Sequence, residues 1–136
     1  MTKKILTILL LFLPLMAWAG SAQPENEADY HLDMGFKTNG TNPKQAFSWY
    51  EGDMIKVTAA KKEATSSKEA EVLYVEYYVD GDLIHKATEA PFQLTYDSRL
   101  ISTGRHRLLT KVYWKAKRHR FVSDFKWNLD ILPAAD

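Results

Sequence analysis

Four histidines are the side chains in this sequence most suited to metal or proton chemistry: His31, His85, His106 and His119. A metal site needs two or more ligands on one face, as in H-E-x-x-H, and no such spacing occurs here. His31 and Asp33 can project from one strand face, but such pairs are common by chance. The sequence therefore predicts no metal and no cofactor, and the inward phase of His106 predicts a buried, hydrogen-bonded structural role.

Nucleophilic and acid–base chemistry also find little support. The chain has no cysteine, and no serine stands on a G-x-S-x-G elbow. The paired carboxylates Glu69/Glu71 and Asp80/Asp82 fall in polar turns, where solvent works against a glycosidase-like acid/base pair. We therefore expect that the protein is not an enzyme, although residues converging across strands would be visible only in the fold.

Basic residues crowd the segment "KAKRHR" over 115–120. This segment links two long strand-like runs, and a positive hairpin tip attracts anionic glycans, lipid head groups or acidic proteins. The alternative is that a hairpin tip is charged only to stay soluble. Under the binding interpretation the contact residues are Lys115, Lys117, Arg118 and Arg120.

A second candidate surface is an outward face shared by three predicted strands. Aromatic rings beside cations can stack on sugars or engage a protein partner. The alternative is cross-strand pairing of Glu76 with Lys111 and packing of the tyrosines over arginine stems. The face has Tyr74, Glu76, Tyr78, Arg107, Lys111, Tyr113 and Lys126, of which Tyr74, Tyr78, Arg107, Lys111 and Tyr113 are the candidate ligand contacts.

The elements that position these residues are strands, because apolar and polar residues alternate with a period of two. Over 73–79 the apolar set is Leu73, Val75, Tyr77 and Val79. Asp80-Gly81 then predicts a tight turn, with 83–87 returning as a partner strand. The same alternation predicts strands over 54–59, 91–97, 105–115 and 121–131.

Short strands without helices to cover them must bury their apolar faces against a second sheet. The expected fold is therefore all-β, an antiparallel β-sandwich of about seven strands, with an up-and-down barrel as the alternative. No window of the chain after residue 19 has a helical apolar stripe.

Several motifs together resemble bacterial immunoglobulin-like domains. The hairpin "VEYYVDGDLI" (75–84) is followed by Ala90-Pro91-Phe92, by Tyr96-Asp97 and by "GRHRLLTKVY" (104–113), and "GDMIKVTA" (52–59) precedes it. The likeness spans about residues 52–113, whereas residues 28–51 match no motif. The resemblance implies an immunoglobulin-like fold, an exported binding or spacer module, and no catalytic residues.

The N-terminus has the order of features of a secretory signal peptide. Lys3 and Lys4 precede an apolar run that is shorter than the roughly 20 residues of a membrane span, and Ala17-Trp18-Ala19 then forms a cleavage site. We expect a signal peptide over 1–19, a flexible leader over 20–27 and the immunoglobulin-like domain over 28–136. The protein is then secreted or periplasmic and has no integral membrane segment after cleavage.

The formal net charge of +1 does not drive binding to nucleic acid. We expect a non-catalytic exported binding or accessory module that contacts a protein or a cell-envelope glycan. The alternatives are a structural subunit of a surface assembly and a carbohydrate-binding module. The sequence leaves the ligand and the oligomeric state open.

Overall fold

The computed structural model describes residues 30–41 and 46–134. The expected signal peptide and leader lie outside the described residues. Among the residues described, no helix is long and apolar enough to cross a bilayer. The described strands all belong to one unit, Leu32–Asp136. They are β2 (Met34–Thr38), β3 (Ala46–Tyr50), β4 (Met54–Lys61), β5 (Ala70–Val79), β6 (Asp82–Ala87), β7 (Leu94–Asp97), β8 (Gly104–Ala116) and β9 (His119–Leu132).

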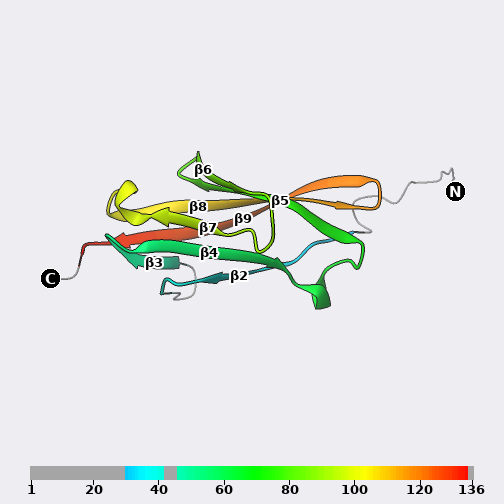
Figure 1. Cartoon of the computed structure of the whole chain (residues 1–136), viewed down its shortest axis with the longest axis horizontal. Helices are drawn as coiled ribbons and strands as arrows, with labels where there is room; N and C mark the ends of the chain where they lie inside the picture. The colour runs from blue at the N-terminus through cyan, green and yellow to red at the C-terminus, as the bar shows by residue number, and fades with distance from the viewer. Residues whose placement is uncertain (1–29, 42–45, 135–136) are drawn as a thin grey trace, which may run out of the picture. The chain divides into compact units, whose positions relative to one another are not determined.

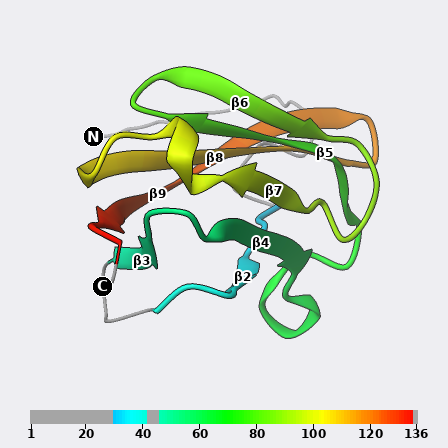
Figure 2. The same ribbon diagram turned by 60° about the vertical axis from the view of Figure 1, so that its left-hand side comes forward.

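The strands form two sheets (Figure 1). One has the order β2-β4-β7 and the other the order β3-β9-β8-β5-β6. Figure 2 shows β4 and β7 side by side in one layer, with β5, β6 and β8 in the other. The expected all-β sandwich is confirmed, with eight strands in the described part of the chain.

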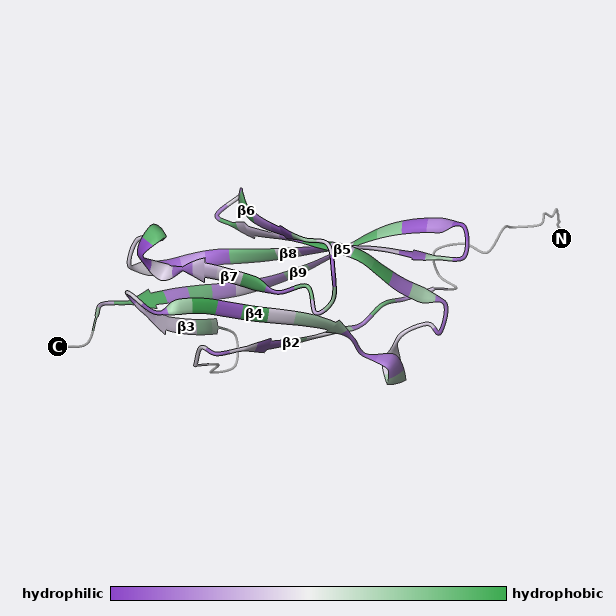
Figure 3. Cartoon of the chain, in the orientation of Figure 1, coloured by the Kyte–Doolittle hydropathy of each residue, from purple (hydrophilic) through white to green (hydrophobic). Residues whose placement is uncertain are grey.

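The core is made by the alternation that the sequence predicted. Bands of apolar and polar residues alternate along β4 and β9 (Figure 3). Fully buried positions come from both sheets, because each strand turns every second side chain inward. They include Ile55 and Val57 of β4, Val75 and Tyr77 of β5, Leu94 of β7, Leu108 and Val112 of β8, and Leu129 and Ile131 of β9.

The hairpin of β5 and β6 closes at the predicted Asp80-Gly81 turn. Asp80 has φ 50° and Gly81 has φ 90°, which is the left-handed pair that suits the twist of a two-residue hairpin loop. The second long hairpin turns at Lys117 and Arg118, between Ala116 and His119. The basic segment "KAKRHR" therefore forms the tip of the β8–β9 hairpin, as the sequence predicted.

Three features differ from the sequence prediction. The pairing of β3 with β9 is parallel, whereas the other pairings between the described strands are antiparallel. The strand expected over 91–97 begins only at Leu94, because Phe92 has φ 52° and its N–H donates to the Glu89 carbonyl in a turn. Leu73 is half-buried rather than in the core, since the β5–β8 register shifts between Val72 and Tyr74.

Candidate functional site

The outer face of the five-stranded sheet brings charged side chains into one row. Lys86 of β6, Glu76 of β5, Lys111 of β8 and Asp124 of β9 are successive register partners across four strands. Opposite charges on neighbouring strands stabilise the sheet modestly. The Lys111 Nζ lies 3.5 Å from an Asp124 carboxylate oxygen, so Lys111 makes its ion pair with β9 rather than with Glu76.

Two tyrosines stack directly beside this row. The rings of Tyr74 and Tyr113 are 4.3 Å apart between centroids, with 18° between their planes. Lys86 places its ammonium 4.3 Å from the centroid of the Tyr74 ring, a cation–π contact. Both tyrosines are half-buried, so the stack forms part of the surface.

Glu76 accepts hydrogen bonds from the tyrosines on either side. The Tyr78 hydroxyl donates to Glu76 Oε1 at 2.8 Å, and the Tyr113 hydroxyl also bonds the Glu76 carboxylate. This carboxylate raises the pKa of Tyr113 to about 12 and also raises the pKa of Tyr78. Both phenols therefore stay protonated at neutral pH and serve as donors, not as bases or nucleophiles.

A hollow of about 220 Å³ opens next to the stack. It lies at the bulge where Leu73 of β5 has no register partner on β8. Val122, on β9, is 52% exposed, and Arg120 adds an exposed guanidinium. The walls are Leu73, Tyr74, Tyr113, Trp114, Arg120, Phe121 and Val122.

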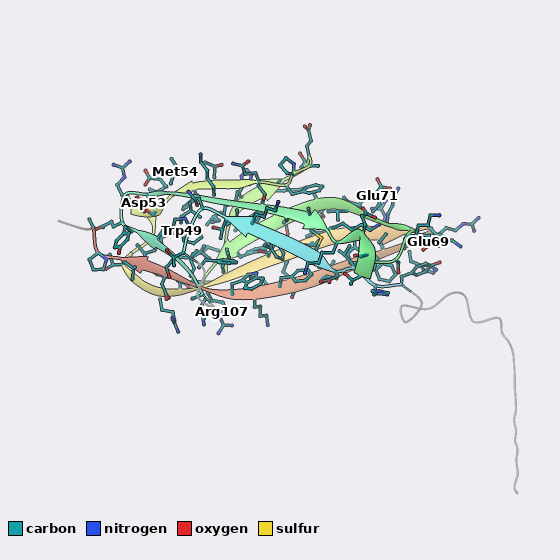
Figure 4. The ribbon with its side chains drawn as sticks, turned by 90° about the horizontal axis from the view of Figure 1, so that it is seen from below. Trp49, Asp53, Met54, Glu69, Glu71 and Arg107 are labelled. Atoms are coloured by element: carbon teal, nitrogen blue, oxygen red, sulfur yellow. The ribbon has the colours of Figure 1, made fainter. Side chains whose placement is uncertain are left out.

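The basic tip continues from this hollow. Lys115 pairs with Arg120 across the β8–β9 hairpin, and its Nζ lies 3.8 Å from a Glu71 carboxylate oxygen. Lys117 and Arg118 form the exposed turn. Figure 4 shows Glu69, just before β5, and Glu71 of β5 at this same end, so these acidic residues offset part of the positive charge.

His106 is the centre of a separate cluster that resembles a hydrolase triad only in residue types. Its Nδ1 lies 2.5 Å from Asp80 Oδ2, and the Ser102 hydroxyl lies 3.4 Å from its Nε2. However, Nε2 is 2.7 Å from the Ser102 backbone carbonyl, which accepts but cannot donate. Both ring nitrogens therefore act as donors, and no lone pair is left to serve as a base for the serine.

The hydrogen bond to Asp80 raises the pKa of His106, which agrees with a doubly protonated ring. The His106 side chain is 12% exposed, so the hydrogen-bonded structural role expected for it fits the geometry. Among residues 30–41 and 46–134, no group of three or more His, Asp or Glu side chains is placed to hold a metal ion.

The sequence of residues 37–109 matches the bacterial Ig domain family. The chain belongs to this family. No curated protein matches the chain. The family match begins within β2 and ends within β8, and it agrees with the resemblance seen over residues 52–113.

A solved structure with the same fold matches the chain at low identity. The chain is similar to fibronectin(III)-like modules of CbhA from Clostridium thermocellum, with 19% identity, a TM-score of 0.51, and coverage of 76% of this chain and 49% of that chain. It therefore spans about half the length of that structure.

Two further solved structures are similar over smaller parts of this chain. A quinonprotein alcohol dehydrogenase-like protein from Bacteroides thetaiotaomicron has 17% identity and a TM-score of 0.42, with coverage of 68% of this chain and 18% of that chain. A lytic polysaccharide monooxygenase from Jonesia denitrificans has 18% identity and a TM-score of 0.35, with coverage of 64% of this chain and 56% of that chain.

The bacterial Ig domain match does not cover the whole candidate surface. Tyr74, Tyr78 and Arg107 lie inside the matched range, whereas Tyr113, the basic tip and β9 lie beyond its end at residue 109. The matched range therefore covers part of the scaffold and part of the candidate surface.

The structure brings together most of the candidate contacts. Tyr74, Tyr78, Lys111 and Tyr113 share one face, and Lys115 and Arg120 adjoin it. Arg107 lies on the same face of β8, two positions before Leu109, the register partner of Tyr78. It is distant only from the tyrosine stack, because it precedes Tyr113 by six positions, or roughly 20 Å of strand.

Three contributors to the surface were missed by the sequence prediction. They are Lys86, Leu73 and Val122. The sequence alone does not place Lys86 on this face, because the register of the β5–β6 pair shifts between Tyr77 and Tyr78. The shift reverses the facing of one strand relative to the other.

Proposed function

We propose that this chain is an exported, non-catalytic accessory module that contacts a cell-envelope component or a protein partner through the outer face of its five-stranded sheet. The observation that supports this most is the Tyr74–Tyr113 stack, flanked by Lys86 and lying in a surface position. Aromatic side chains that are half exposed beside cations are typical of contact surfaces. Membership of the bacterial Ig domain family fits an accessory role without catalysis.

The charge distribution supports a contact at the same end of the sheet. Arg118 and Arg120 are exposed and make no ion pair among the described residues. Exposed cations close to an aromatic surface increase the encounter rate with anionic partners. The export part of the proposal rests on the signal-peptide pattern of residues 1–19.

The test is comparative capture from envelope extracts. The exported protein, immobilised, is compared with a Tyr74→Ser/Tyr113→Ser double variant and with Tyr50→Ser, which removes a tyrosine that is 49% exposed on β3. We expect components retained by the wild type and by Tyr50→Ser but lost from the double variant. Identical sets of captured components for all three proteins would contradict the proposal.

A second candidate is a structural subunit of a surface assembly, and the edge strand β6 favours it. Beside β6 lies a hollow of about 380 Å³, whose walls include Leu83 and Leu100, which are 52% and 68% exposed. An exposed strand edge can pair with another chain, although Asp82 and Lys86 act against such pairing. Sedimentation velocity distinguishes the two functions, since assembly requires concentration-dependent association that Leu83→Lys abolishes.

A further inference from the structure

The hollow beside the tyrosine stack has an aromatic wall on one side and a guanidinium on the other. We propose that it is a subsite for a single ring of a carboxylated sugar polymer, with the ring against Tyr113 and the carboxylate at Arg120. This inference rests on the proposed function and names the ligand class of the same surface.

The size of the hollow selects a small occupant. Its volume of about 220 Å³ is below the range of roughly 300–1,000 Å³ for pockets that enclose a drug-sized ligand. A single sugar ring of a longer chain fits this description, with neighbouring rings lying on the open sheet face. The hollow lies at the bulge, where Leu73 has no partner on β8 and forms part of the wall.

The stack leaves one aromatic face for a ligand. Lys86 and Tyr113 come from strands on opposite sides of β5, and each lies 4.3 Å from the centroid of the Tyr74 ring, so together they cover both of its faces. Tyr113 itself lines the hollow, together with Val122, its cross-strand partner on β9. The C–H face of a sugar ring packs against such an apolar and aromatic wall.

The charges around the hollow favour an anion. Arg120 is exposed and has no ion-pair partner in the described part of the chain, and a guanidinium binds a carboxylate through two parallel hydrogen bonds. Lys115 is its register partner on β8. The contact between Lys115 Nζ and the Glu71 carboxylate is long, at 3.8 Å.

A sugar fits this place better than an acidic peptide. An extended peptide binds by adding a strand to a sheet edge, but β8 is already paired with β5 on one side and β9 on the other at Tyr113. Peptide backbone groups would therefore find no partners here. Sugar hydroxyls, by contrast, can exchange hydrogen bonds with Glu76 and Lys111, which lie two positions along the same face.

The experiment is calorimetric titration of the exported protein with carboxylated tetrasaccharides of galacturonate, guluronate and hyaluronan type. Each is paired with the same oligomer after reduction of its carboxyl groups to alcohols. We expect at least one acidic oligomer to bind, with affinity lower by about tenfold or more for its reduced form. Arg120→Gln and Tyr113→Ala should each weaken binding by about tenfold or more, while Tyr113→Phe retains the ring and retains binding.

The matched control is Lys37→Gln, which removes one exposed positive charge from β2 in the other sheet and should leave affinity unchanged. Arg120→Gln is an exposed substitution, and circular dichroism verifies its fold. The inference is overturned if no acidic oligomer binds, if the reduced form binds equally well, if Arg120→Gln has no effect, or if polyglutamate competes equally. The proposed function survives any of these results when envelope capture still depends on Tyr74 and Tyr113.

Discussion

His106 and Asp80 are joined by a hydrogen bond of 2.5 Å between Nδ1 and Oδ2, across 26 positions of the sequence. The other Asp80 oxygen accepts from the Arg107 backbone N–H at 2.9 Å. The tight turn between β5 and β6 is thereby fixed to the beginning of β8. Because the link joins two titratable side chains, its strength depends on the protonation of His106 and Asp80.

The first prediction is a decrease of stability at alkaline pH. The pKa of His106 is raised above 6.5, chiefly by Asp80, so the folded state holds this proton more tightly than the unfolded chain. The contribution is fully present below about pH 6.5 and is lost as pH rises through the folded-state pKa. Urea unfolding between about pH 6 and 9 should show this loss in the wild type and not in His106→Gln; equal slopes would contradict it.

The acid side has the opposite sign. The backbone N–H of Arg107 and the side chain of His106 lower the pKa of Asp80. Its contribution is present above the unfolded value of about 3.9 and is lost as pH falls through the folded-state pKa. Asp80→Asn should therefore reduce the dependence of the unfolding free energy on pH in both the acid and the alkaline range, since it removes the partner of His106 as well.

Tyr77 is predicted to be one of the most costly positions in the core. Its ring is fully buried, and its hydroxyl donates to the Phe92 carbonyl at 2.6 Å. Tyr77→Ser should reduce the free energy of unfolding by about 3–5 kcal/mol, as large aromatic truncations do. Tyr77→Phe should cost about 1–3 kcal/mol, because it leaves a carbonyl unsatisfied.

The matched surface variant is Tyr78→Phe, one position along β5 on the outer face. We expect it to change stability by less than about 0.5 kcal/mol, the usual range for surface positions. Denaturant titration of the three variants checks the order. A loss below that limit for Tyr77→Ser would place this ring outside the core.

Gly40 is predicted to tolerate no side chain. A Cβ at this position would lie 2.7 Å from the Ser48 carbonyl oxygen and 2.7 Å from the ring of Trp49, which is 3% exposed. Gly40→Ala should destabilise the protein by about 1–3 kcal/mol, as overpacking does, and should shift tryptophan emission. Gly35→Ala is the control, since its nearest neighbour would be the flexible Lys62 side chain at 3.4 Å; equal costs would contradict the prediction.

The basic tip gives a separate prediction. Changing Lys115, Arg118 and Arg120 together to Ser should weaken retention of anionic envelope components and reduce the salt dependence of binding. The fold should be retained, because none of these side chains is in the core. Affinity that stays intact for every anionic ligand would remove the tip from the binding surface.

Export is tested by the mass of the protein recovered outside the cytoplasm. Cleavage after Ala19 predicts a chain that begins at Gly20. Recovery of a chain that still begins at Met1, in the membrane fraction, would contradict the signal-peptide interpretation.

Much of the fold was predictable because β4, β5, β8 and β9 alternate regularly and bury one face. The strand β3 was not, since "AFSWY" is short and its parallel pairing with β9 joins residues about 80 positions apart. The outward phase of Tyr74 and Tyr113 was predictable from the same alternation. Their hollow was not, because the bulge at Leu73 is a property of the pairing and not of one strand.

The His106–Asp80 link was also beyond the sequence. The turn at Asp80 and the inward phase of His106 were each visible, but their contact depends on the register of β5 with β8. Local patterns define the facing of a side chain within its strand, and only the pairing of strands defines its neighbours.

The central claim is that the outer face of the five-stranded sheet is the contact surface. Amide chemical-shift mapping of the isotope-labelled protein, titrated with the envelope fraction it retains, tests this most directly. We predict shifts concentrated at Tyr74, Glu76, Lys111, Tyr113 and Arg120 on β5, β8 and β9. Shifts confined to β2, β4 and β7 would contradict the claim.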